Sequence, residues 1–519
     1  MGSVSAVTLL LALSPVIVVL LLLLIRKTPA DLAGLAGWIV TLVVAGLAFR
    51  TPLKVLFGAS AAGIVASLPI TLMVGASIFQ VTVMLETRAI ARVVSAIKTV
   101  SPADPIIQIM VINVGFGTIL AALGATPVSI LPPIMVALGY STTVAIALPA
   151  IGYDALCTYA LLGIPVVIFA NFFGRPLNEV GIYFARFMPV ITTCIALGML
   201  WIVGKGKMLV RGFPAALLAG VTAGFVAIGM NAANLIPLTG IAAGSAVIVV
   251  MVLMLKVRGR KVFDRGVLNP ADIDIERAVP LWKALSPWWI MTALALVVNA
   301  PFLPFFKLTF DKLAMPLSII PGAPEKVRLF WQAYFWILIS TFLALPFLRP
   351  RHGVLAVSWK KWLKRAPRPM LASAIFFAIA YVINHSGKGM DWQLADAGRN
   401  MVNVVAQAAA AGFDRLYPLV APFLGLLAGF ISGSESSAIA MMTKIHLVTS
   451  EKIQALGILV AAASGIGGGL ASVISPAKLQ NASASIDRIG EEAKVIPTVM
   501  AVALAITAVA AVLTLFWAF

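Results

Sequence analysis

Long stretches without a charged side chain constrain this sequence more than any other feature. Residues 5–25 and 496–518 contain no Asp, Glu, Lys or Arg. A helix of about 20 apolar residues can cross the hydrocarbon core of a bilayer, which is roughly 30 Å thick. A β-barrel would instead show alternating segments of about ten residues. With 61% hydrophobic and 11% charged residues, the sequence predicts an all-α, polytopic integral membrane protein.

We predict roughly 12 to 14 membrane helices, because some apolar segments are too short or too interrupted to cross. The first segment lacks the basic start of a cleaved signal peptide, so we expect it to be retained. Glu86, Arg88, Arg92 and Lys98 recur at near-helical spacing within 82–104. This spacing predicts an interfacial amphipathic helix, with an ion pair across a cavity as the alternative. The apolar segments are 5–25, 32–49, 55–79, 106–121, 127–140, 142–172, 187–203, 212–230, 235–256, 288–303, 328–347, 370–385, 416–432, 436–449, 453–474 and 496–518.

Basic residues gather in three loops, and the formal net charge is +19. An even number of predicted spans separates each pair of loops, so all three can face the cytoplasm, where Lys and Arg accumulate. The charge is therefore explained without a nucleic-acid partner. The loops contain Lys205, Lys207 and Arg211; Arg258, Arg260, Lys261 and Arg265; and Arg349, Arg351, Lys360, Lys361, Lys364, Arg365 and Arg368.

The sequence offers no motif for catalysis, for a metal or for a cofactor. It lacks a phosphate-binding P-loop, a His/Glu zinc pattern and a nucleophile elbow. Cys157 and Cys194 lie in apolar segments without metal-ligand spacing. We therefore predict that the protein is not an enzyme. If it moves a solute against a gradient, an ion gradient rather than ATP should supply the energy.

The two halves of the sequence repeat one order of segments. An apolar segment, a Gly/Ser/Thr-rich break and a second apolar segment occur at 115–133 and at 421–442. Each is followed by a Pro-containing segment, Gly-Ile-Pro at 163–165 and Ile-Ser-Pro at 474–476. Secondary transporters built from two inverted repeats place such breaks near the bilayer midplane. We predict one transporter domain over 1–519, with repeat 1 at about 50–205, connecting spans at about 206–347 and repeat 2 at about 366–519.

The break at 432–437 contains an acid inside an apolar stretch. Glu435 is the only charged residue between Arg415 and Lys444. Ser434 is expected to cap a helix that has Glu435 in its first turn, where the helix dipole favours an acid. A charge at the bilayer centre still costs roughly 2.5–3.5 kcal/mol. Glu435 is therefore a candidate to titrate, to bind a cation or to orient backbone donors; a structural cap that reaches interfacial water is the alternative.

Other interruptions supply further candidates. Thr126 can cap a helix beginning at Pro127, although a Gly/Pro kink would explain the same residues. Asp154 lies inside a long apolar run. Lys478 follows a glycine-rich stretch and either attracts an organic anion or extends to the interface.

At these breaks the sequence resembles the lactate permease family of secondary carriers. The likeness covers about a third of the chain, and its segments are "FGTILAALGATPVSILPPIMVALGY" (116–140), "ALLGIPVVIFANFFG" (160–174), "APFLGLLAGFISGSESSAIAMM" (421–442), "ISPAKLQNASASIDRIGEE" (474–492) and, more weakly, "LASAIFFAIAYVINHSG" (371–387). Four positions depart from the family pattern. Glu435 stands where the family usually has aspartate, and the position near Ala121, where the family has an acid, is neutral here. Asp154 lies where the family usually has an Asn-Thr pair. Lys478 stands where the family has a small residue.

The resemblance implies H⁺-coupled uptake of lactate, glycolate or a related 2-hydroxy monocarboxylate across a bacterial or archaeal plasma membrane. It also implies two re-entrant hairpins, alternating access by a shift of the hairpin-bearing region past a scaffold, and a homodimer. Glu435 or Asp154 would carry the proton. Coupling to Na⁺, transport of a dicarboxylate or sulfonate, and an anion channel or receptor are the alternatives. The substrate-binding candidates are Gly124, Ala125, Thr126, Ser434, Ser436, Ser437, Ser475 and Lys478.

Overall fold

The computed structural model describes residues 5–26, 28–100, 104–124, 126–299, 303–472, 474–486, 488 and 490–519. Within them, eight helical stretches are long and apolar enough to cross a membrane, and several shorter apolar helices accompany them. The chain is thus a polytopic all-α membrane protein, as predicted. The described residues add one short β-hairpin, β1 (Met315–Ile320) paired with β2 (Ala323–Val327), which the hydrophobicity pattern did not predict.

The described residues of the first half of the chain form twelve α-helices, in the order that follows. They are α1 (Ala6–Leu24), α2 (Ala30–Leu47), α3 (Leu53–Glu86), α4 (Ala89–Lys98), α5 (Pro105–Ile109), α6 (Gly117–Ala122), α7 (Pro127–Ala137), α8 (Thr142–Tyr153), α9 (Ala160–Phe173), α10 (Leu177–Ala185), α11 (Met188–Ala232) and α12 (Thr239–Val257). A π-helix, η1 (Met110–Phe116), joins α5 to α6, and a 3-10 helix, η2 (Asp154–Tyr159), joins α8 to α9.

The second half contains the remaining α-helices. They are α13 (Pro270–Ala278), α14 (Leu281–Ala284), α15 (Ser286–Asn299), α16 (Ala333–Leu348), α17 (Val354–Arg365), α18 (Pro367–His385), α19 (Met401–Phe413), α20 (Tyr417–Ser432), α21 (Glu435–Lys452), α22 (Gly457–Ser472), α23 (Pro476–Ala484) and α24 (Glu492–Trp517). Short 3-10 or π turns cover Ile236–Leu238, Arg265–Val267, Lys307–Lys312, Ala397–Arg399 and Asp414–Leu416.

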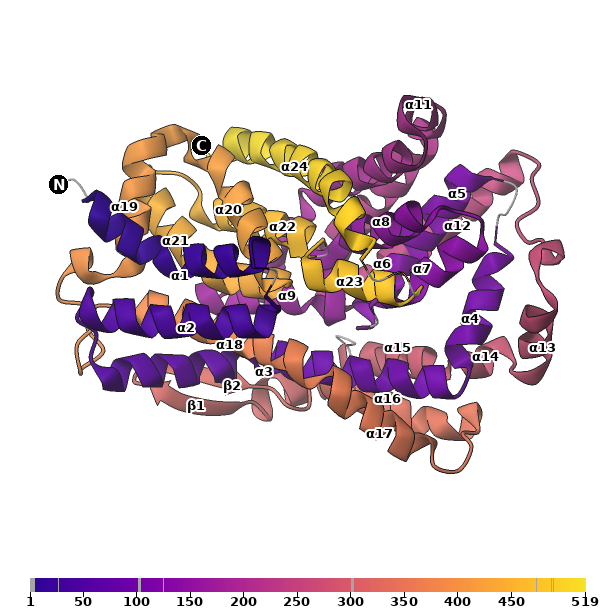
Figure 1. Cartoon of the computed structure of the whole chain (residues 1–519), viewed down its shortest axis with the longest axis horizontal. Coiled ribbons are helices and arrows are strands. Elements are labelled where there is room, and N and C mark those ends of the chain that lie inside the picture. Colours follow the sequence, from indigo (N-terminus) through magenta and orange to yellow (C-terminus); the bar gives the residue numbers. More distant parts are fainter. Residues whose placement is uncertain are drawn as a thin grey trace.

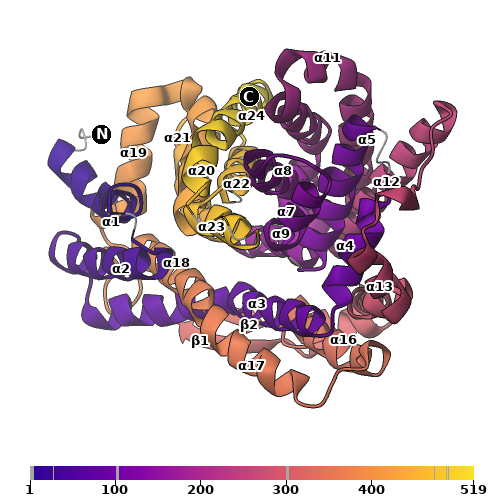
Figure 2. The ribbon, with the colours of Figure 1, turned by 45° about the vertical axis from the view of Figure 1, so that its right-hand side comes forward.

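One group of helices forms a layer along the long axis of the molecule. Helices α1, α2, α18 and α3 lie side by side, and α16 and α17 pack on α3 (Figures 1 and 2). The buried amide of Gln80 on α3 donates to Ser340 Oγ and Thr341 Oγ1 of α16, each at 3.1 Å. Because an unpaired buried amide is costly, these bonds fix the register of α3 against α16.

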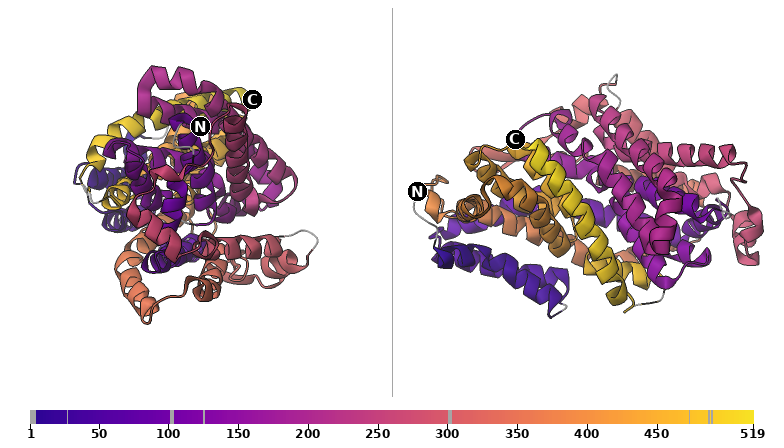
Figure 3. Two further views of the ribbon diagram at one scale, coloured as in Figure 1. Left: turned by 90° about the vertical axis from the view of Figure 1, so that its right-hand side faces the viewer. Right: turned by 90° about the horizontal axis from the view of Figure 1, so that it is seen from above.

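A second group contains α20, α21, α22, α23 and α24, together with α7, α8 and α9 (Figures 2 and 3). Glycines bring α20 and α22 into backbone contact. A Cβ atom on Gly425 would lie 1.8 Å from the carbonyl oxygen of Ser464, and one on Gly429 would lie 2.0 Å from that of Gly468. Small residues permit this close approach of helices in a membrane.

The segment that was predicted to be amphipathic forms α4. Its Arg92 pairs with Glu276 at 3.3 Å, and its Lys98 pairs with Asp272 at 2.8 Å, both on α13. These ion pairs join α4 to α13. In Figure 1, α13 and the basic helix α17 lie toward one end, whereas β1, β2 and the N-terminus lie toward the other. Under the positive-inside rule, an end rich in Lys and Arg is expected to face the cytoplasm.

Helices are interrupted at the four predicted places. The chain turns between α6 and α7, and again between α20 and α21. Leu161, Leu162 and Gly163 have positive φ angles near the start of α9. The helical conformation also stops between α22 and α23. Figure 1 shows α5 and α7 in the right half of the molecule and α20 and α21 in the left half.

Candidate functional site

Glu435 lies at the turn between α20 and α21, where the sequence predicted a helix cap. The hydroxyl of Ser434 accepts a hydrogen bond from the backbone N–H of Ser437 at 3.3 Å, so the cap is confirmed. Glu435 follows in the first turn and is 3% exposed. Its Oε1 accepts a hydrogen bond from Thr158 Oγ1 at 2.6 Å, while Oε2 has no hydrogen-bond partner among the described residues. A buried carboxyl group is therefore only half satisfied.

Side chains from two other interrupted helices surround this carboxyl group. Thr158 and the thiol of Cys157, a further neighbour of Glu435, both come from η2. The ammonium group of Lys478 on α23 acts on Glu435 electrostatically. It also lies 4.8 Å from the centre of the Tyr153 ring. Segments that are far apart in the sequence thus converge on one acid.

Ser475 brings a second helix N-terminus to the same place. Ser475 precedes α23, and its hydroxyl lies 3.2 Å from the position of a Cβ atom built on Gly433. Gly433 has φ +65°, a conformation that glycine adopts without strain. The hydroxyls of Ser437 and Ser475 are buried and have no hydrogen-bond partner among the described residues. Two helix N-termini, which carry partial positive charge, therefore meet beside free hydroxyl groups.

The first break lies against a different set of residues. Gly124 has φ +80°, and a Cβ atom there would meet Ile337, Leu161 and Ser77. Helix α6, which ends just before Gly124, packs against η2 and α9, so the break borders the helix that carries Thr158. Thr126 occupies the cap position before Pro127, but its side chain makes no cap hydrogen bond. The expected capping by the Thr126 hydroxyl was therefore wrong.

Two predicted residues cannot be placed in the site. Ala125 lies outside the described residues, and so does the side chain of Asp154, whose backbone begins η2. Ser436 is 4% exposed and lies in the first turn of α21.

The sequence reasoning missed two polar partners. Thr158 was not predicted as a site residue, because nothing local indicates a contact with a residue 277 positions away. His446 on α21 was not considered. Its Nδ1 lies 2.7 Å from Tyr417 Oη and its Nε2 lies 2.7 Å from Ser464 Oγ, and all three residues are buried. A histidine inside an apolar segment, with Tyr and Ser in the segments on either side, was the sequence signal that could have predicted this network.

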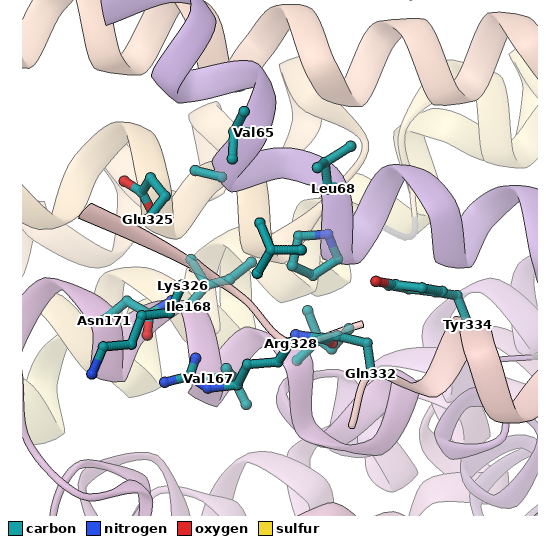
Figure 4. A pocket seen from close by; sticks show the side chains of 14 residues that line it. Val65, Leu68, Val167, Ile168, Asn171, Glu325, Lys326, Arg328, Gln332 and Tyr334 are labelled. Atoms are coloured by element: carbon teal, nitrogen blue, oxygen red, sulfur yellow. The ribbon is translucent and has the colours of Figure 1, made fainter. Parts of the chain in front are cut away.

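A separate small pocket lies between α3, α9 and β2. Figure 4 shows Glu325, Lys326 and Arg328 around it, together with Asn171 of α9. None of its lining residues belongs to the set around Glu435, and its free space is close to that of one water molecule. This pocket does not overlap the candidate site.

Known proteins are similar to this chain over nearly its whole length, including the interrupted helices. The family model described as L-lactate permease matches residues 8–519. The glycolate permease GlcA of Escherichia coli (strain K12) is 24% identical, with 98% of this chain and 95% of that protein aligned. L-lactate permeases of Bacillus subtilis (strain 168) and Escherichia coli (strain K12) are each 24% identical, and each alignment covers 93% of this chain and 90% or 91% of the relative. Because the family model matches nearly the whole of this polytopic chain, the protein belongs to the L-lactate permease family.

Proposed function

We propose that this protein is a secondary transporter that carries a small 2-hydroxy monocarboxylate, such as lactate or glycolate, together with H⁺. The names of its relatives support the substrate class. The observation that carries the proposal is the half-satisfied, buried carboxyl group of Glu435 beside two helix N-termini. An ionised acid inside a membrane protein is costly, so an acid that is kept there is a candidate for a functional role.

The surroundings of Glu435 suit an organic anion. The N-termini of α21 and α23 offer backbone N–H groups and partial positive charge, which favour a carboxylate. Lys478 adds a full positive charge nearby. The buried hydroxyls of Ser437 and Ser475 provide hydrogen-bonding groups for a carboxylate and for a 2-hydroxyl. These contacts would satisfy groups that the described residues leave unpaired.

Glu435 is also our candidate for proton coupling. In its charged form it has one hydrogen-bonded oxygen and one unpaired oxygen in a region shielded from water. Protonation removes that cost, and Lys478 together with an incoming anion changes the local charge. A proton and a carboxylate can therefore bind in a linked way. Asp154 stays the alternative proton carrier, and Na⁺ the alternative coupling ion.

The arrangement of the interrupted helices supports alternating access. The hairpin α20–α21 and the segment α5–α7 lie toward opposite ends of the molecule (Figure 1), as inverted repeats require. Helix α21 packs on α9, and α7 packs on α23, so each half contacts the interrupted helix of the other. We propose that these elements move together past a scaffold of α2, α3, α16 and α18.

Uptake into proteoliposomes tests this function. We expect an alkaline interior to drive accumulation of labelled L-lactate or glycolate, and unlabelled substrate inside to drive counterflow. Glu435→Gln should abolish pH-driven accumulation, because the amide cannot exchange a proton. Glu451→Gln, on the exposed end of the same helix, is the matched control.

Several results would contradict the proposal. Full pH-driven uptake by the Glu435→Gln variant would leave Glu435 a structural cap. Accumulation that follows Na⁺ and ignores the pH gradient would replace H⁺ by Na⁺. Stronger competition by a dicarboxylate than by lactate would indicate that Lys478 selects a dianion, and flux without counterflow would indicate a channel.

A further inference from the structure

The stretch from Arg349 to Arg368, which contains α17 and the first residues of α18, carries seven Lys and Arg residues and no acid. Two of the seven are used within the protein: Lys361 pairs with Glu86, and Arg368 pairs with Asp31 through two hydrogen bonds of 2.8 and 3.0 Å. The other five are exposed, and the described residues offer none of them an ion-pair partner; they are Arg349, Arg351, Lys360, Lys364 and Arg365. These five residues form a cationic surface that is not used in ion pairs with the described residues.

The same helix exposes a row of apolar side chains beside its basic row. Leu355, Trp359 and Leu363 recur every four residues and are 37%, 51% and 50% exposed. Residues four apart lie on one face of a helix. Lys360 and Lys364 form the neighbouring row, one position further along. An apolar row next to a basic row is the pattern of a helix lying in the membrane interface.

Contacts with α3 hold this helix in place. Trp362 Nε1 donates a hydrogen bond to the carbonyl oxygen of Gly75 at 2.7 Å. Trp359 stacks on Trp362 with ring centres 4.6 Å apart, and its edge meets Phe79 of α3. The face toward α3 is therefore held by the protein. Leu355, Leu363, the exposed half of Trp359 and the basic row are left for another partner.

We propose that α17 is a binding surface for anionic phospholipid headgroups of the cytoplasmic leaflet. The apolar row would enter the boundary between headgroups and acyl chains, and Lys360, Lys364 and Arg365 would contact the phosphates. A basic residue near an anionic membrane surface contributes about fivefold to the preference for anionic lipid. The contact also reaches the transport region. Helix α17 is hydrogen-bonded to Gly75 of α3, and Ser77, two residues further along α3, lies against Gly124 of the first break.

Quenching of Trp359 by brominated lipid tests this proposal without any transport assay. The full-length protein is reconstituted in phosphatidylcholine with a fixed share of brominated phosphatidylglycerol or of brominated phosphatidylcholine. The Trp359 signal is the emission that is lost in Trp359→Phe. We expect brominated phosphatidylglycerol to quench this signal more strongly at equal mole fraction, and added inorganic phosphate to leave the difference unchanged.

A charge variant and a matched control decide the outcome. The triple variant K360Q, K364Q and R365Q should lose the preference for phosphatidylglycerol, a fall of about a hundredfold for three charges. The variant K205Q, K207Q and R211Q removes three charges from another predicted cytoplasmic loop and should keep it. Equal quenching by both lipids, or an unchanged preference in the first triple variant, would overturn the proposal. Release by inorganic phosphate would show a free-anion site instead of a lipid surface.

Discussion

At the scale of single residues, the contact between Thr158 and Glu435 joins the two halves of the chain. The hydroxyl of Thr158 donates a hydrogen bond of 2.6 Å to Glu435 Oε1. A hydrogen bond to a charged group contributes about 1.5–3 kcal/mol. We predict that Thr158→Val lowers the initial rate of pH-driven uptake by about tenfold or more. Valine keeps the shape of threonine and removes only the donor.

Thr158→Ser is the control for this prediction, because serine keeps the hydroxyl. It should retain most of the wild-type uptake rate in the same proteoliposomes. Equal loss in the Ser and Val variants would point to packing of the Thr158 methyl group, and the hydrogen bond to Glu435 would then have no role in transport.

His446 makes a prediction about stability. It bonds to Tyr417 on α20 and to Ser464 on α22, so its loss leaves two buried hydroxyls without their partner. Each unpaired buried group costs about 1–3 kcal/mol. We predict that His446→Leu lowers the thermal midpoint of the detergent-purified protein. The midpoint is measured by size-exclusion chromatography of samples that have been heated. His352→Leu, at an exposed loop position, should leave the midpoint unchanged; an unchanged midpoint for His446→Leu would show that the network contributes little.

Local chemistry explains which site residues the sequence could predict. The cap by Ser434 and the first-turn place of Glu435 depend on neighbours within three residues, and both were confirmed. The same local rule failed at Thr126, where the backbone adopts the cap conformation but the hydroxyl makes no cap bond. The partners of Glu435 come from η2 and α23, and no local pattern encodes such long-range contacts.

At the scale of elements, the backbone contact between α20 and α22 has the sharpest consequence. A methyl group at Gly425 or Gly429 would overlap a carbonyl oxygen of α22 at 1.8 or 2.0 Å. The helices must then separate, and overpacking of this kind costs typically 1–3 kcal/mol or more. We predict that Gly425→Ala and Gly429→Ala each reduce the yield of monodisperse protein and its thermal midpoint.

Gly412→Ala on α19 is the matched control, because a Cβ atom there meets nothing within 4 Å. It should be neutral or slightly stabilising, since alanine favours the helix over glycine. Normal yield and stability of the Gly425→Ala variant would mean that α20 and α22 are not in backbone contact in the membrane.

Hydrophobicity predicted the apolar helices well, because membrane spans are set by length and the absence of charge. The broken helix at 142–172 was predicted as one interrupted segment and is α8, η2 and α9. Among the described residues, the elements that hydropathy did not predict are α10, α13, α14, α17, α19 and the β-hairpin. Their sequences mix polar and apolar residues, so hydropathy alone does not separate them from loops.

At the scale of the whole molecule, α9 of the second group of helices approaches α3 of the first. Leu68 of α3 and Ile168 of α9 line the same narrow pocket (Figure 4). Under the proposed function, α9 belongs to the moving elements and α3 to the scaffold. Their relative position must therefore change during each cycle, whereas contacts within the scaffold, such as Trp38 with Ser60 at 3.0 Å, should persist.

A flexible cross-link distinguishes a contact that must change during transport from one that persists. We predict that Leu68→Cys with Ile168→Cys, joined by a bismaleimide, loses substrate accumulation and counterflow while it still binds substrate, because alternation between two open states requires the two groups to slide. Trp38→Cys with Ser60→Cys, joined by the same reagent, should transport normally. Both pairs are built in a background without Cys157 and Cys194 that itself transports. If the joined Leu68–Ile168 variant transports at the rate of its unjoined form, α9 does not move past α3, and the substrate must reach Glu435 from both sides by smaller motions of the hairpins.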